Sequence, residues 1–300
     1  MKKSTFITPF FALAALTAGA QLAEVGTPQP LLRGVQSDLY NPVLSRDGSR
    51  LLFSSADYSN LRMYDFNDNV TVSVCKDARS GFDAQFTPDA SAVVFVSQRT
   101  AENGMNMRRV QTYDVESRRL EAISEETRAV ERPLVGNGSV QITDTKGRRT
   151  VGRKAVDGVR TSGSVLYITV GGVESAYTPV PSQAGYIWAS LSPSGKKVMF
   201  FAAGRGIVIT DLKGNVLSEP GKYEAPVWFG DDHIVAMNAT DDGHQFRSSQ
   251  IVLLKADGSE MQELTRPESM SMNPTASIQG GKIVYNTIDG LLYQMDVRLK

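Results

Sequence analysis

Short apolar segments recur along the chain, each preceded by a turn rich in proline, aspartate and glycine. Proline presets φ at a turn corner, aspartate bonds back to the backbone, and glycine adopts positive φ. The alternation around these segments is typical of β-strands, in which successive side chains point to opposite faces. Six copies of this unit begin at Pro42, Ala84, Pro133, Ala189, Pro226 and Pro274. The mean step of about 46 residues is in the range of propeller blades.

Each unit is expected to form four strands. The first is brief, and the second is the most apolar, as expected for a strand buried on both faces. The third alternates, as in Ile207-Val208-Ile209-Thr210, and the fourth is more polar, as in Val70-Thr71-Val72-Ser73-Val74. The third unit, from Pro133, is long, Arg-rich and the weakest copy. No stretch after residue 20 has the pattern of a long amphipathic helix.

The last unit lacks a fourth strand, because few residues follow Met295. The segment around residues 30–34 precedes the first unit and has the character of a fourth strand. Closing a ring with it would remove an exposed sheet edge. We therefore predict an all-β fold: a six-bladed β-propeller of four-stranded antiparallel blades over residues 21–300, closed by an N-terminal strand. An open array, or five blades plus an irregular domain, is the alternative.

Residues 1–20 have the three-part pattern of a secretory signal peptide. Lys2 and Lys3 are followed by an apolar stretch, and Ala18-Gly19-Ala20 forms a small-residue cleavage site before Gln21. The apolar stretch is shorter than the roughly 20 residues that span a membrane, and it contains Pro9. The pattern predicts export to the periplasm or beyond, with no transmembrane anchor after cleavage. An uncleaved anchor is the alternative.

Composition narrows the classes of function. Lys and Arg total 32 and Asp and Glu total 32, so no net charge attracts nucleic acid or anionic lipid. A single cysteine, Cys75, excludes an internal disulfide framework. Cys75 closes the fourth strand of the first unit, and we expect it to be inert and half-buried. Hydrophobic residues make up 41% of the chain, an ordinary globular proportion.

The turns identify a resemblance. The segments Ser45-Arg46-Asp47-Gly48, Thr87-Pro88-Asp89-Ala90 and Ser192-Pro193-Ser194-Gly195, each leading into an apolar strand, resemble the TolB-like propeller repeat, a WD-like family common in bacterial envelope proteins. The resemblance covers roughly residues 30–300. It implies a propeller, but not the α/β domain that TolB carries before its own propeller. Propellers of this kind serve as scaffolds, lyases and non-catalytic halves of peptidases.

Few residues suggest catalysis. The sequence has no G-x-S-x-G nucleophile elbow. His233 and His244 are the only histidines, too few for the several-histidine metal site of lyase-like propellers. Carboxylates near Asp241 lack the spacing of a dedicated calcium loop. We expect no enzyme activity, no metal and no cofactor.

The stretch from Arg99 to Arg160 carries 13 basic and 9 acidic residues. It could contact an acidic partner, such as an anionic glycan or protein, or be a solvated charged loop. It lacks the aromatics of a single-strand nucleic-acid platform. Its basic residues include Arg108, Arg109, Arg118, Arg119, Arg148, Arg149, Arg153, Lys154 and Arg160.

Loops that enter the innermost strands of a propeller surround one mouth of its channel. These positions form the candidate binding surface, although packing between blades is the alternative explanation for their aromatics. The candidates are Tyr40, Asn41, Phe82, Asp83, Arg132, Trp188, Glu224 and Asn273. Aromatic and Arg side chains are favoured in interface hot spots.

The expected function is a non-catalytic binding scaffold in the bacterial cell envelope, holding a protein or peptide at the mouth. A carbohydrate-binding or polysaccharide lyase-like propeller with a channel metal is the alternative, and a structural ring that contacts partners through its outer edge is another. The sequence predicts no nucleic-acid partner and no particular oligomeric state.

Overall fold

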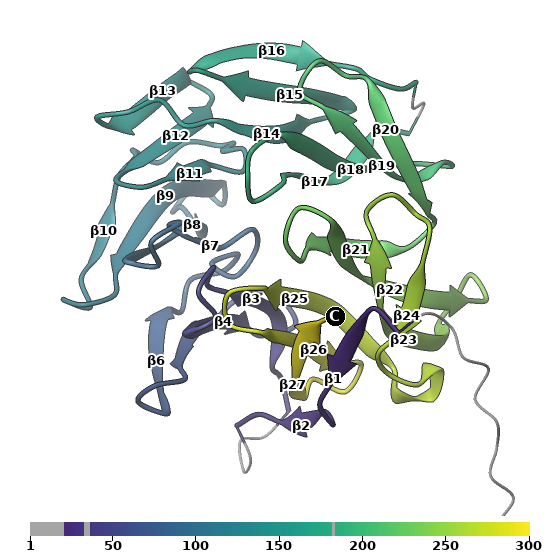
Figure 1. The fold of residues 1–300 in the computed structure, drawn as a ribbon. Coiled ribbons are helices and arrows are strands. Elements are labelled where there is room, and N and C mark those ends of the chain that lie inside the picture. The colour runs from purple at the N-terminus through teal and green to yellow at the C-terminus, as the bar shows by residue number, and fades with distance from the viewer. Residues whose placement is uncertain (1–20, 33–36, 182–183) are drawn as a thin grey trace, which may run out of the picture.

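The computed structural model describes residues 21–32, 37–181 and 184–300. Within them, seven antiparallel sheets stand around a central axis as the blades of a propeller (Figure 1). The signal-peptide pattern of residues 1–20 lies outside the described residues. No helix in the described part of the chain is long and apolar enough to cross a membrane.

Four blades follow the expected pattern, with four strands in chain order from the axis outward (Figure 1). Blade 1 contains β3 (Tyr40–Leu44), β4 (Arg50–Ser54), β5 (Leu61–Asp65) and β6 (Val70–Cys75). Blade 2 contains β7 (Gln85–Phe86), β8 (Ala92–Thr100), β9 (Asn106–Asp114) and β10 (Leu120–Ala122). Blade 5 contains β17 (Tyr186–Leu191), β18 (Lys197–Ala202), β19 (Gly206–Asp211) and β20 (Val216–Gly221). Blade 6 contains β21 (Glu224–Trp228), β22 (His233–Asp241), β23 (Phe246–Lys255) and β24 (Met261–Glu263).

Blade 7 is closed by an N-terminal strand. It contains β25 (Ser271–Ser277), β26 (Lys282–Thr287) and β27 (Leu292–Leu299), reached through the short 3₁₀ turn η1 (Pro267–Ser269). Its outer strand is β1 (Ala23–Val25), which pairs antiparallel with β27. The closing strand therefore lies earlier than the expected segment at residues 30–34, of which 33 and 34 are outside the described residues. The two-residue strand β2 (Gln29–Pro30) pairs farther along β27.

The prediction of six blades is wrong, because the long third unit forms two blades. Blade 3 contains β11 (Leu134–Gly136), β12 (Ser139–Asp144) and β13 (Gly147–Gly152). Blade 4 contains β14 (Gly158–Ser162), β15 (Val165–Val170) and β16 (Val173–Tyr177). Each has three strands, so the expectation of four strands in every blade also fails here. Two short sheets fit into the length that the repeat spacing assigned to one.

Strand β14 runs opposite to its neighbour β11. Ser162, at the end of β14, donates a hydrogen bond to Glu131, which precedes β11. Gly158, the first residue of β14, lies against Leu134, the first residue of β11. The inner strands of blades 1 and 7, by contrast, run parallel, since Leu44 and Arg46 of blade 1 bond to Thr275 and Ser277 of blade 7 in the same order. Blade 4 therefore begins without the inner strand and the Pro/Asp/Gly turn that identify the other blades.

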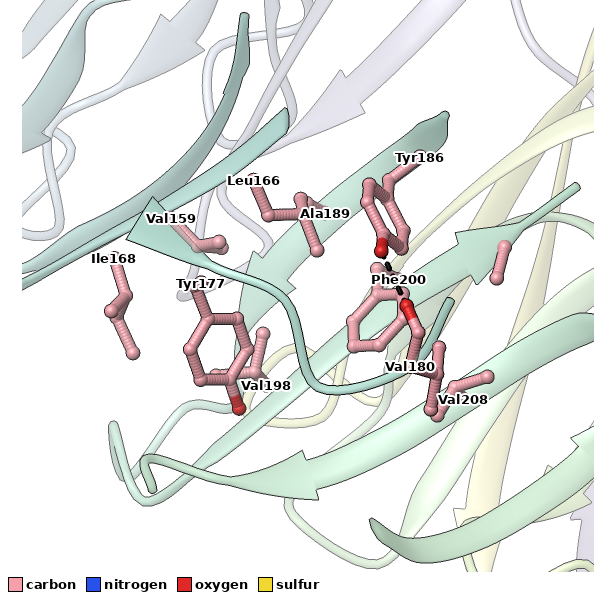
Figure 2. Close-up of a cluster of buried hydrophobic side chains, with 11 residues drawn as sticks. Val159, Leu166, Ile168, Tyr177, Val180, Tyr186, Ala189, Val198, Phe200 and Val208 are labelled. Carbon is pink, nitrogen blue, oxygen red and sulfur yellow. Dashed lines mark hydrogen bonds between the residues drawn. The ribbon is translucent and has the colours of Figure 1, made fainter. Parts of the chain in front are cut away.

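The core of the ring is divided among the junctions between blades. Six clusters of buried apolar side chains each join two neighbouring blades. Figure 2 shows the cluster between blades 4 and 5, where the rings of Tyr186 and Phe200 meet edge to face at 5.4 Å. The Tyr186 hydroxyl donates to the carbonyl oxygen of Val180. Burying one such large side chain stabilises a fold by about 1.5–3 kcal/mol.

The junction between blades 3 and 4 has no such cluster among the described residues, and an ionic network lies there instead. Arg160 of β14, only 6% exposed, donates two hydrogen bonds of 2.9 Å to the carboxylate of Glu174 on β16. It also pairs with Glu131 of blade 3 and lies over the ring of Tyr167 at 4.4 Å. Arg148 of blade 3 approaches Glu174 at 3.6 Å. The hydrogen bond from Arg160 is the largest cause that lowers the pKa of Glu174 below its usual value.

Candidate functional site

The inner strands of five blades share one local distortion at the mouth of the channel. A residue within the first three positions of the strand, or in blade 2 two positions before it, adopts a left-handed backbone. These residues are Asn41 (φ 55°), Asp83 (59°), Trp188 (52°), Ala225 (45°) and Asn273 (49°). In four of the blades the strand register shifts at this point, as in a β-bulge. A bulge bends the strand and changes the direction of its side chains.

Left-handed backbone is unfavourable for residues other than glycine and is tolerated best by Asn and Asp. Three of the five positions are Asn or Asp, but Trp188 and Ala225 have no such side-chain compensation. The surrounding sheet must therefore hold those two in place, at a cost of order 1–3 kcal/mol each. Strain of this kind recurs near the start of the inner strands of blades 5 and 6.

Several of the predicted residues make hydrogen bonds that join strands or blades at the mouth. The Asn41 amide donates to Ser54 Oγ at 3.1 Å, and the Asn273 amide donates to Asn286 Oδ1 at 3.3 Å. Both bonds join the distorted inner strand to the second strand of the same blade. The Tyr40 hydroxyl donates to the carbonyl oxygen of Ile288 at 3.2 Å and so joins blade 1 to blade 7.

Arg132 joins three blades. Its guanidinium lies 3.9 Å from the Asp83 carboxylate of blade 2 and donates to Gln85 Oε1 at 3.5 Å. It also donates to the carbonyl oxygen of Ala189 in blade 5 at 3.4 Å, which is beyond the neighbouring blade 4. Arg132 therefore reaches across part of the mouth. On the opposite face, Arg46 of blade 1 likewise donates to the carbonyl oxygen of Pro193 in blade 5 at 3.5 Å.

Two aromatic groups flank these polar contacts. Phe82 packs edge to face against Tyr58 with ring centroids 5.1 Å apart, and the Arg79 guanidinium lies over it at 4.0 Å. Trp188 is 40% exposed, and Ile187 beside it is 49% exposed. The rings of Trp188 and Phe201 meet at 5.5 Å. Sequence reasoning missed Tyr58 and Arg79, although loops that follow the second and fourth strands lie at the same face as the mouth.

Glu224 lies half-buried at the start of β21. Burial raises its pKa, and the nearby Asp241 carboxylate raises it further. The carboxyl group of Glu224 therefore holds its proton to a higher pH than an exposed glutamate does.

The two histidines do not converge. His233 begins β22, and His244 lies in the turn after its other end, so about 30 Å of strand separates them. The described residues contain no group of three or more His, Cys, Asp or Glu side chains placed to bind a metal ion. Cys75 is buried, more deeply than the expected half-buried state, and burial raises the pKa of its thiol.

The chain resembles known proteins in fold. No family model matches the sequence, and no curated protein matches it. The propeller domain of Cps50 (Swd1) from Myceliophteria thermophila is similar with a TM-score of 0.61 at 9% identity, over 92% of this chain and 100% of that one. The tricorn protease is similar with a TM-score of 0.50 at 16% identity, over 87% of this chain and 25% of that one. TolB from Acinetobacter baumannii is similar with a TM-score of 0.48 at 15% identity, over 76% of this chain and 54% of that one.

This chain thus spans about half the length of TolB and a quarter of tricorn. At these identities the likeness concerns the fold alone. It agrees with the TolB-like, WD-like propeller architecture expected from the turns, and it assigns no activity to this chain.

Proposed function

We propose that this chain is an exported, non-catalytic propeller that holds a protein or peptide partner at its mouth. The observation that carries the proposal is the pairing of exposed apolar groups with a rigid frame. Trp188 and Ile187 are exposed at the mouth, and the left-handed backbone at Trp188 fixes their direction. Trp and Arg are the side chains most often found in interface hot spots.

The polar groups of the mouth support binding over catalysis. Asn41, Asn273 and Tyr40 are engaged in hydrogen bonds within the ring. Asp83 and Arg132 neutralise each other. A surface whose polar groups hold one another in place is preorganised, and preorganisation lowers the entropy lost when a partner binds.

Export rests on the sequence pattern of residues 1–20, with cleavage before Gln21. The proposal places the mature ring in the bacterial cell envelope, either periplasmic or secreted. N-terminal sequencing of the protein recovered from envelope fractions tests this part: a mature N-terminus at Gln21 supports it, and an intact Met1 contradicts it.

The binding test compares matched variants of the chain beginning at Gln21. The double variant Phe82→Ala, Trp188→Ala removes two aromatic groups of the mouth. The control Val173→Ala, Leu217→Ala removes two exposed apolar groups far from it, 73% and 53% exposed. We expect a partner captured from envelope extracts to be retained by the control and lost by the mouth variant. A partner lost equally from both variants, or from neither, contradicts binding at the mouth.

A further inference from the structure

Blade 3 ends one strand early. Its outermost strand is β13, which pairs with β12 from Gly147 to Gly152 and has no strand on its other side among the described residues. Blade 2 continues to a fourth strand at the corresponding position. Backbone groups of alternate residues point to opposite edges of a strand, so about half of β13 presents its N–H and C=O groups outward.

The chain itself does not fill this position. After Gly152, the backbone N–H of Lys154 donates to Ser139 Oγ near the inner turn of the blade. Val156 then packs against Gly136, at the end of the innermost strand. The segment therefore runs back toward the axis to begin β14, away from the open edge of β13.

The open edge and the chain just past its end are strongly basic. Residues 146–154 include Lys146, Arg148, Arg149, Arg153 and Lys154 and no acidic residue. Three of these cations are paired, with Glu125, Glu174 and Asp144 respectively. Arg153 and Lys154 are exposed and have no ion pair within the described part of the chain.

We propose that β13 accepts an extended, acidic segment of a partner protein as the fourth strand of blade 3. Strand addition uses the main-chain groups of an open edge for affinity. The unpaired charges of Arg153 and Lys154, which directly follow Gly152 at one end of the edge, select a segment of opposite charge. A second copy of this chain is disfavoured, because antiparallel pairing of two β13 strands places the basic side chains of each opposite the other. The site lies on the rim, so the proposal is independent of the mouth.

The test uses the chain from Gln21 and an eight-residue peptide of alternating Glu and Val, capped at both ends. A matched peptide of alternating Lys and Val tests charge, and a peptide N-methylated at alternate amides tests main-chain pairing. Affinity is measured by fluorescence anisotropy, and hydrogen exchange is followed at residues 147–152. We expect the acidic peptide to bind and to slow exchange in β13, while both matched peptides fail to do so.

The variant Arg153→Glu, Lys154→Glu should weaken binding about tenfold or more, since two attractions become repulsions. The control Arg118→Glu, Arg119→Glu changes the same charge on the turn of blade 2 and should leave binding unchanged. Phe82→Ala, Trp188→Ala should also leave it unchanged. The proposal would be overturned if the N-methylated peptide bound, or if β13 gained no protection from exchange. It would also be overturned if protection appeared at higher protein concentration without peptide, because that would indicate pairing with a second copy.

Discussion

Two junctions on either side of blade 4 hold the ring together by different means. Between blades 4 and 5, apolar side chains such as Tyr186 and Phe200 interdigitate (Figure 2). Between blades 3 and 4, Arg160 and two carboxylates occupy the interface. Apolar packing gains free energy from burial alone, whereas a buried ion pair must first offset the cost of removing charges from water. The second junction therefore depends on every partner being in place.

The difference between the two junctions follows from the position of β14 and the alternation of its side chains. At Gly158, a Cβ atom would lie 2.8 Å from a methyl carbon of Leu134, so a side chain at this position would require Leu134 to shift. Val159 points to the apolar junction with blade 5, and the next residue, Arg160, points to blade 3. One three-stranded sheet thus presents an apolar face and an ionic face, because successive residues of a strand alternate.

The largest effect is expected at the apolar junction. Phe200→Ala leaves a cavity beside Tyr186, since Phe200 is fully buried. We expect a loss of about 3–5 kcal/mol in the free energy of unfolding, measured by urea denaturation. A loss below about 1 kcal/mol would mean that blades 4 and 5 are not held by this cluster.

Arg160→Met should cost about 3 kcal/mol, the lower end of the range for breaking a buried pair, because Glu174 loses its main partner but keeps Arg148 nearby. The sharper test is the double variant Arg160→Met, Glu174→Leu. Removing both charges should restore stability to within about 1 kcal/mol of the wild type. If the double variant is less stable than the single one, the ion pair contributes more than its desolvation costs. The two junctions would then not differ in the way described.

Tyr186→Phe removes the only hydrogen bond drawn in Figure 2 and keeps the ring. The expected loss is about 1 kcal/mol, because the Val180 carbonyl oxygen is left without this donor. The same urea measurement checks it. An effect as large as that of Phe200→Ala would assign the junction to its polar contact and not to its packing.

The smallest change in stability is expected when the pH is lowered. The pKa of Glu174 is lowered in the folded protein from 4.5. A lowered folded-state pKa gives stability that is present above the unfolded value and is lost as pH falls through the folded value. Unfolding midpoints of the wild type should therefore fall more steeply below about pH 4.5 than those of Glu174→Gln. Parallel curves for the two proteins would contradict the linkage.

The sequence predicted the blades that contain the repeated turn. The four-stranded blades were found from their Pro, Asp and Gly residues, and the need for ring closure predicted an N-terminal strand. Blade 4 was missed because β14 enters from the opposite direction and has no such turn. Arg160 was counted with a charged stretch, since a single sequence does not reveal that Glu131 and Glu174 meet it in space.

The mouth was predicted by position but not by conformation. Asn41, Asp83 and Asn273 are residue types that tolerate left-handed backbone, so their φ values could have been anticipated. Nothing in the local sequence indicates the same backbone at Trp188 or Ala225. Those two positions are set by the register of the sheet, which is a tertiary property.

The pairing of β1 with β27 also sets the order of events during synthesis. Val25 pairs with Val297, so β1 is made before every other described strand and is the last to find its partner. Until residues near Val297 are available, the ring keeps one unclosed seam, so blade 7 is completed only by nearly the whole chain.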